Sequence, residues 1–176
     1  EAVLPPPPEL SAPAYVPSNF TVNMSVEPHE APMHLLVDLV SRIMTAEGPI
    51  HRDLVARRVS AAFGKARTGG RIQSASDQAL TRAVRSAAVV MEGDFAMTEA
   101  QRSDCPVRDR SGENAPVKAV LLPPVEIRAA AARVIAESGE MPREDLIVAI
   151  ARILGFAKTG KDLRDQIDRS LLEGQA

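Results

Sequence analysis

The sequence predicts a mainly α-helical fold in which one helical unit occurs twice. Apolar residues make up 45% of the 176 residues, yet the chain has four Phe, one Tyr and no Trp. A core of Ala, Leu, Val and Ile suits short helices better than a β-sandwich or barrel. The segments FGKARTGGRI (63–72) and LGFAKTGKDL (154–163) share Gly, Ala, a cation, Thr and Gly at the same spacing. We therefore expect the same helical corner twice, 91 residues apart.

Residues 1–29 differ in composition from the rest of the chain. They hold seven prolines, three acids and no Lys or Arg. We expect an extended linker, stiffest at Pro5–Pro8 and mostly without a core of its own. A proline-rich docking ligand is the alternative. Because the chain begins with Glu and a proline run, we also expect it to be a piece of a larger protein.

Residues 30–100 are expected to form a first module of three helices and a hairpin. Leu36, Val40 and Ile43 share one face of the first helix. A second and a third helix follow, joined by the FGKARTGGRI segment. The run AVVMEGDFAM (88–97) holds two β-like stretches around a Glu-Gly-Asp turn, which indicates a hairpin. Three helices followed by a hairpin predict a winged-helix-like module.

The helical pattern recurs after an aperiodic connection over residues 101–124. Residues 125–176 repeat it, and the register holds without a gap at the pairs Gly48/Gly139, Arg52/Arg143, Asp77/Asp168 and Leu80/Leu171. An ungapped register across three helices indicates a duplicated module. The predicted fold class is therefore tandem duplicated winged-helix-like (helix-turn-helix) modules. The β-hairpin wing is expected in the first module and is absent or truncated in the second.

The repeated segment is open to two interpretations. Gly155 and Gly160-Lys161 fit a phosphate-binding loop, but a buried strand should precede such a loop and Ser or Thr should close it. Here an amphipathic helix precedes it, and Asp162 occupies the closing position. The structural interpretation is favoured: Gly64 and Gly155 each close a helix with positive φ, and the Thr of each segment caps the next helix.

A mismatch between the two copies points to the first as a phosphate-contacting surface. Arg71 lies in the first turn of the third helix, where the helix dipole opposes a cation, and Asp162 takes that place in the second copy. A phosphate docked there would compensate the arginine. Gln78 and Arg85 continue the exposed face. The candidate nucleic-acid-binding residues are Arg57, Arg58, Lys65, Arg67, Arg71, Gln73, Ser74 and Arg82.

Two features argue against strong DNA binding, and a solvated surface is the alternative for this face. The predicted wing tip carries Glu92 and Asp94. The third helix of the second copy mixes arginines with three aspartates. We therefore assign any DNA contact to the first module, with the second as a brace or a protein-docking unit.

No catalytic, metal or cofactor constellation is evident. The three histidines have no cysteine cluster beside them, and His51 suits a helix cap or the surface. The single cysteine, Cys105, excludes an internal disulfide, is expected to be inert, and fits a reducing cytoplasm. The VRDRS segment (107–111) is expected to be a packed salt-bridge strap rather than an active site. No apolar run is long enough to span a bilayer.

A family resemblance rests on EGPIHRDLVARRVSAAFGKARTGGRIQ, PVRDRSG, PPVEIRAAA and LGFAKTGKDLR. About residues 30–173 resemble the C-terminal region, formally a domain of unknown function, of very large bacterial helicase-like proteins. In those proteins it follows superfamily-one motor segments and often a nuclease-like domain. The resemblance implies a DNA-processing parent and upstream helicase or nuclease domains as partners. It supplies no catalytic residues for this segment.

These observations predict a non-catalytic accessory region that contacts DNA through its first module. The alternative is an intramolecular or partner-docking scaffold without nucleic-acid contact. A third hypothesis is nucleotide binding through residues 155–161.

Overall fold

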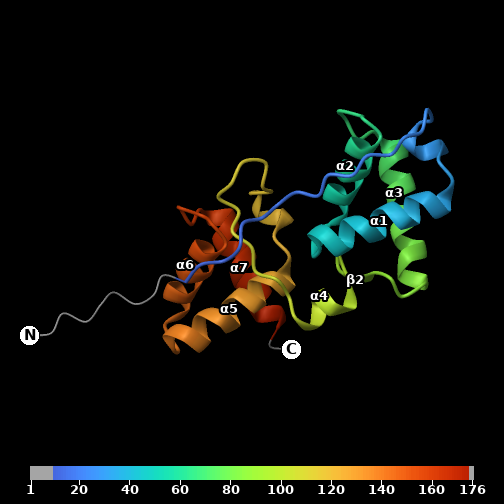
Figure 1. Ribbon diagram of the computed structural model, residues 1–176. Helices are drawn as coiled ribbons and strands as arrows, with labels where there is room; N and C mark the ends of the chain where they lie inside the picture. Colours follow the sequence, from blue (N-terminus) through green and yellow to red (C-terminus); the bar gives the residue numbers. More distant parts are fainter. Residues whose placement is uncertain (1–9, 175–176) are drawn as a thin grey trace, which may run out of the picture.

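The computed structural model describes residues 10–174, so the predicted stiff linker at Pro5–Pro8 lies outside the described residues. The described chain is mainly helical, with a small antiparallel sheet between two groups of helices (Figure 1). Its helices are α1 (Met33–Glu47), α2 (Arg52–Ala62), α3 (Gly70–Arg85), α4 (Glu99–Ser103), α5 (Pro124–Ser138), α6 (Arg143–Ile153) and α7 (Lys161–Glu173). Two short 3₁₀ helices are η1 (Pro28–Glu30) and η2 (Ala119–Leu121).

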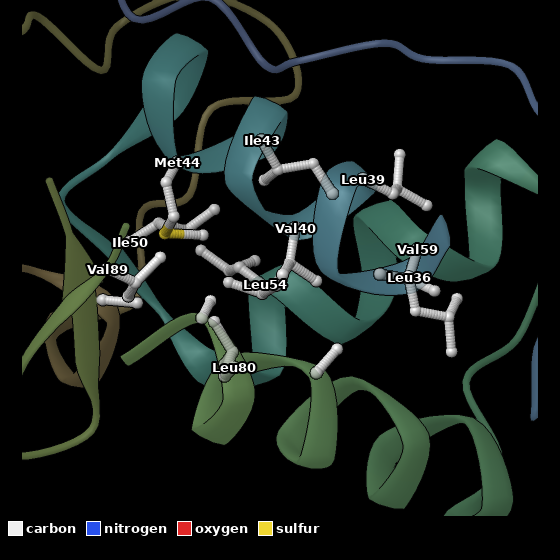
Figure 2. Close-up of a cluster of buried hydrophobic side chains, with 14 of the residues drawn as sticks. Leu36, Leu39, Val40, Ile43, Met44, Ile50, Leu54, Val59, Leu80 and Val89 are labelled. Carbon is white, nitrogen blue, oxygen red and sulfur yellow. The ribbon is translucent and has the colours of Figure 1, made fainter. Parts of the chain in front are cut away.

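The first group, α1 to α3, encloses an aliphatic core. The apolar stripe of α1 lies against α2 and α3, and its residues Leu36, Val40 and Ile43 are buried. Figure 2 shows Val40 beside Leu54 and Leu36 beside Val59 of α2. The helical periodicity of the sequence thus predicts the buried face correctly.

Three short strands form the sheet: β1 (Ile50–His51), β2 (Val90–Glu92) and β3 (Phe95–Met97). Their order is β1-β3-β2, and both pairings are antiparallel. Gly93 turns the β2–β3 hairpin with a φ of 58°, so the predicted hairpin is present. His51 ends β1 and caps α2, because its Nδ1 accepts a hydrogen bond from the Asp53 backbone at 3.1 Å.

The second group, α5 to α7, starts its helices 91 residues after α1, α2 and α3. The ends of α5 and α6 are also displaced by 91 residues from those of α1 and α2. Gly64 and Gly155 follow α2 and α6 with φ of 73° and 90°, as the sequence predicts. The core of this group includes Ile127, Ile150 and Ile167, all fully buried.

The predicted threonine caps are not formed. The N-cap residues of α3 and α7 are Gly69 and Gly160, neither of which provides a side-chain cap. Thr68 instead lies 3.0 Å from the buried Ser60, hydroxyl to hydroxyl. The Thr68 hydroxyl therefore forms a hydrogen bond with Ser60 of α2 and does not cap α3.

The N-terminal segment, residues 10–27, is extended and packs against both groups of helices. Figure 1 shows it running along both groups of helices. Leu10 packs against the second core, and Phe20 and Val22 pack against the first. Tyr15, between these ends, is 5% exposed. This part of the chain is therefore integral to the fold.

Candidate nucleic-acid interface

Helix α3 carries a continuous polar stripe on its solvent face. The stripe consists of five exposed residues, Arg71, Ser74, Gln78, Arg82 and Arg85. At about 100° per residue, these positions fall within about 80° of the helix circumference. Among the described residues, none of the three arginine side chains makes an ion pair or a hydrogen bond. The stripe is therefore a row of uncompensated cations interrupted by two neutral polar groups.

The joint before α3 adds two more cations. Arg57 on α2 and Arg67 in the joint are exposed, and neither side chain has a partner in the described part of the chain. No atom lies within 4 Å of a Cβ built at Gly64, Gly69 or Gly70. The first joint is therefore open to solvent, and its backbone could be approached closely by a ligand.

Other predicted contact residues are engaged inside the protein. Arg58 is 18% exposed and donates to Glu47 through Nε and Nη2, with the shortest bond at 2.7 Å. Lys65 donates to Glu27 at 2.6 Å, and Gln73 donates to Asp77 at 3.3 Å. Ser74 remains exposed but accepts from Gln78 at 3.3 Å. Arg58 is therefore not available as the predicted nucleic-acid contact, because its side chain turns inward to the buried carboxylate of Glu47.

The predicted wing tip is also engaged. Glu92 pairs with Arg128 of α5, and Asp94 lies 3.4 Å from Arg52. Phe95 and Met97 of β3 form a small apolar cluster with Val125. The hairpin therefore connects the two groups of helices instead of projecting into solvent.

The corresponding stripe on α7 has the opposite charge character. The positions 91 residues after Arg71, Ser74, Gln78 and Arg82 are Asp162, Asp165, Arg169 and Glu173, all of them exposed. Asp165 accepts from Lys161 at 2.9 Å, which lowers the pKa of this exposed carboxyl. Three carboxylates around one arginine are unfavourable for phosphate.

The second joint is covered at Gly155, whereas the first joint is open at the corresponding Gly64. A Cβ at Gly155 would lie within 3 Å of Asp109, Arg110 and Ser111. Arg110 donates from its backbone to Leu154 at 2.9 Å. The VRDRS segment therefore packs against the start of this joint at Gly155, and α6 precedes the joint as the sequence predicts. A helix rather than a strand precedes Gly155, and Asp162 follows Lys161 in the first turn of α7, which argues against a phosphate-binding loop at residues 155–161.

A buried polar cluster, which is not among the predictions from the sequence, lies between the two groups of helices. Glu47, 1% exposed, accepts hydrogen bonds from Tyr15 at 2.6 Å, from Ser18 at 2.6 Å and from Arg58. Burial alone would raise the pKa of Glu47, but the bonds from Arg58, Ser18 and Tyr15 outweigh it and lower the pKa. One signal was available in the sequence: Glu47 continues the apolar stripe of α1 at the spacing of Val40, Ile43 and Met44.

A second buried carboxylate completes this cluster from the other side. Glu126 is fully buried, and it pairs with Arg110 and accepts the backbone N–H of Arg108 at 2.9 Å. Arg108 donates through Nη1 to the carbonyls of Glu47 and Gly48 at 2.9 and 2.8 Å. Both arginines lie over the ring of Tyr15, at 5.8 and 5.1 Å from its centroid. The VRDRS segment is thus a packed, ion-paired strap, which agrees with the expectation.

Cys105 lies at the edge of this cluster, half-buried. Burial and the charge of Glu126 raise the pKa of its thiol to about 12, despite Arg108, Arg110 and Arg128 nearby. The thiolate is therefore scarce at neutral pH. Within residues 10–174, no group of three or more His, Cys, Asp and Glu is arranged to hold a metal ion. None of the helices described here is both long and apolar enough to cross a membrane.

The described residues form a mainly helical fold with a small three-stranded sheet, and α3 carries a cationic face that has no ion-pair partner among them. Residues 26–74 match a protein family described as a protein of unknown function (DUF3320). The match runs from just before η1 to the first turns of α3, so it includes the open joint, Arg57, Arg67 and Arg71. No curated protein matches the chain significantly. No solved structure does so either.

Proposed function

We propose that the chain is a non-catalytic region of a helicase- or nuclease-type DNA-processing protein that contacts DNA through its first module. Residues 30–100 are taken as a winged-helix-like module, and residues 125–176 as a second copy of its helical part. The common displacement of helix starts and the two positive-φ glycines support this duplication.

The observation that carries the proposal is the uncompensated cationic stripe of α3 beside the open first joint. Arg57, Arg67, Arg71 and Arg82 are exposed and unpaired among the described residues, so binding phosphate breaks no internal ion pair. Ser74 and Gln78 lie between the arginines and offer groups for base edges or phosphates. Because the net charge of the chain is −2, the chain as a whole does not attract nucleic acid. Any attraction must therefore come from this local cationic surface.

The proposed contact uses the helix and the joint, not the hairpin. Glu92 and Asp94 at the hairpin turn are acidic and already paired. We therefore leave Arg58 and the hairpin out of the contact and assign the second group of helices a bracing role.

The test removes cations at and beside the first joint and compares the result with removal of the corresponding cation from the second joint. Arg67→Ala/Arg71→Ala should weaken binding of a duplex oligonucleotide, measured by fluorescence anisotropy, and should reduce the slope of log affinity against log salt by about 2. Lys158→Ala is the control, because Lys158 is exposed and occupies the position of Arg67 in the second joint. Equal losses in both variants, or no loss in either, would contradict the assignment.

The alternative function is a docking scaffold without nucleic-acid contact. The acidic stripe of α7 favours it, since Asp162, Asp165 and Glu173 could attract a basic protein segment. Under this alternative, duplex DNA gives no measurable signal even at low salt.

A further inference from the structure

A cavity of about 340 Å³ lies in the first group of helices, between α3 and the hairpin. Its apolar part is formed by Leu80 and Val84 of α3 and by Met91 of β2. The charged residues that line it are Arg52 of α2 and Asp77 and Arg85 of α3. A volume of this size, with an apolar surface and a few polar groups, is typical of small-ligand sites.

Two of these charged residues have counterparts that pair with each other in the second group of helices. Arg143 and Asp168 lie 91 residues after Arg52 and Asp77. Arg143 donates from Nε to the Asp168 carboxylate at 2.8 Å and from Nη2 to the Asp168 carbonyl at 3.1 Å. An arginine and an aspartate at these two positions can therefore satisfy one another.

Within the described residues of the first group, Arg52 and Asp77 do not form this pair. The Nε atom of Arg52 is buried there without a hydrogen-bond partner, and its ion-pair neighbour, Asp94, lies 3.4 Å away. The Asp77 carboxylate accepts a long hydrogen bond from Gln73, at 3.3 Å. Each of the two charged groups therefore retains hydrogen-bonding capacity, and both line the cavity.

The residue one turn further along α3 agrees with this difference between the two groups. The Thr81 hydroxyl donates to the carbonyl of Asp77 at 3.0 Å, and the equivalent carbonyl of Asp168 accepts from Arg143 instead. Leu172 occupies the position of Thr81 in the second group and has no hydroxyl to offer. The threonine thus replaces one of the bonds that would hold the arginine against the aspartate.

We propose that this cavity binds a free α-amino acid with an aliphatic side chain, in its zwitterionic form. The ligand carboxylate accepts hydrogen bonds from Arg52 and Arg85, and the ligand ammonium donates to the carboxylate of Asp77. The aliphatic side chain lies against Leu80 and Val84. The ligand thereby supplies to the arginine and to the aspartate the partners that they give each other in the second group.

The lining distinguishes this ligand from related ones. A phosphate carries more negative charge and is repelled by Asp77. A simple carboxylic acid leaves Asp77 without a cation, and a simple amine leaves Arg52 without an anion. A free amino acid carries both charges on one carbon atom. The proposal goes beyond DNA binding and does not depend on it, because neither Arg52 nor Asp77 belongs to the proposed phosphate contacts.

The probe is L-leucine, titrated into the ¹⁵N-labelled chain. We expect saturable amide shifts centred on residues 52, 77–85 and 91. N-acetyl-L-leucine lacks the ammonium and L-leucinamide lacks the carboxylate, so each should bind about tenfold more weakly than L-leucine. Glycine should also bind more weakly, because it has no side chain to contact the apolar part of the cavity.

Two variants assign the charges to their residues. Asp77→Asn should weaken the binding of L-leucine about tenfold and leave that of N-acetyl-L-leucine unchanged, because the acetylated ligand has no ammonium. Arg52→Met keeps the aliphatic stem and should weaken L-leucine by a similar factor, while L-leucinamide is unaffected. Asp162→Asn is the control, since Asp162 is exposed on α7 and should not alter binding.

Three results would overturn the proposal. The first is an absence of saturable shifts with L-leucine up to roughly 10 mM. The second is equal binding of L-leucine, N-acetyl-L-leucine and L-leucinamide, which would exclude recognition of both charges. The third is unchanged binding of L-leucine in Asp77→Asn and Arg52→Met. The comparison of ligands uses the wild-type chain, so it decides the question even if a variant fails to fold.

Discussion

At the scale of single residues, Glu47 connects α1 to three other segments of the chain. It lies at the end of α1 and receives hydrogen bonds from the N-terminal segment and from α2. Arg108 approaches its backbone carbonyl from the VRDRS segment. A buried carboxylate is costly unless it is fully bonded, and here several donors satisfy it. The cluster therefore makes the relative placement of three chain segments specific.

Removing this carboxylate should destabilise the fold strongly. Glu47→Ala leaves the inward-facing Arg58 without its partner, and we expect a loss of about 3 kcal/mol in the free energy of unfolding. Urea denaturation followed by circular dichroism measures it. Glu99→Ala is the control, because its pair with Arg102 is 56% and 51% exposed and should contribute at most about 0.5 kcal/mol. Comparable effects of the two substitutions would show that the cluster is not a stabilising unit.

The lowered pKa of Glu47 also predicts a dependence of stability on pH. Burial acts to raise the pKa of Glu47, but hydrogen bonds from Arg58, Ser18 and Tyr15 outweigh it and hold the folded pKa below its ordinary value. The contribution of Glu47 is thus present above the unfolded pKa and is lost as the pH falls through the folded pKa. We expect the free energy of unfolding to decrease between about pH 5 and pH 3, and to decrease less in Glu47→Gln. Parallel slopes in the two proteins would assign the acid sensitivity to other carboxyls.

At the scale of elements, the glycines of the two joints have similar backbone conformations but different surroundings. Gly64 and Gly155 both have positive φ, but only Gly155 lies against the VRDRS segment. The second joint is packed against the VRDRS segment at Gly155, whereas the first is open to solvent at Gly64. Arg71 and Asp162 in the following helices agree with this division.

Alanine substitutions at the two glycines should separate these roles. Gly64→Ala adds only the strain of a left-handed residue, about 1 to 2 kcal/mol. Gly155→Ala adds the same strain and a clash with backbone atoms of residues 110 and 111, so we expect a loss of about 3 kcal/mol or more. Thermal denaturation of both variants checks the order. Equal losses would mean that residues 109–111 move away without cost.

The sequence predicts the helices, the hairpin and the glycine joints because these follow from local patterns. Leu36, Val40 and Ile43 recur at the helical period, and Gly93 sits between two β-like runs. The inward turn of Arg58 depends on Glu47 eleven residues away, and the position of Tyr15 depends on residues 108–110. Such contacts are set by tertiary packing, so periodicity does not reveal them. Thr68 was misassigned as a cap for the same reason, since Ser60 takes its hydroxyl.

At the scale of the whole molecule, three connections hold the two groups of helices together. They are the extended residues 10–27, the hairpin with its contact to Val125, and the buried Glu47–Glu126 cluster. The cationic stripe of α3 and the acidic stripe of α7 are consequently fixed relative to one another. A nucleic acid bound to the first would be kept from spreading over the second by charge.

The salt dependence of duplex binding tests the central claim most directly. If Arg57, Arg67, Arg71 and Arg82 contact phosphates, log affinity should fall against log salt with a slope of about −3 to −4. Fluorescence anisotropy of a labelled duplex between about 50 and 200 mM salt measures the slope. Absence of binding at about 50 mM salt, or an affinity that does not change with salt, would contradict a phosphate-contacting surface on this protein.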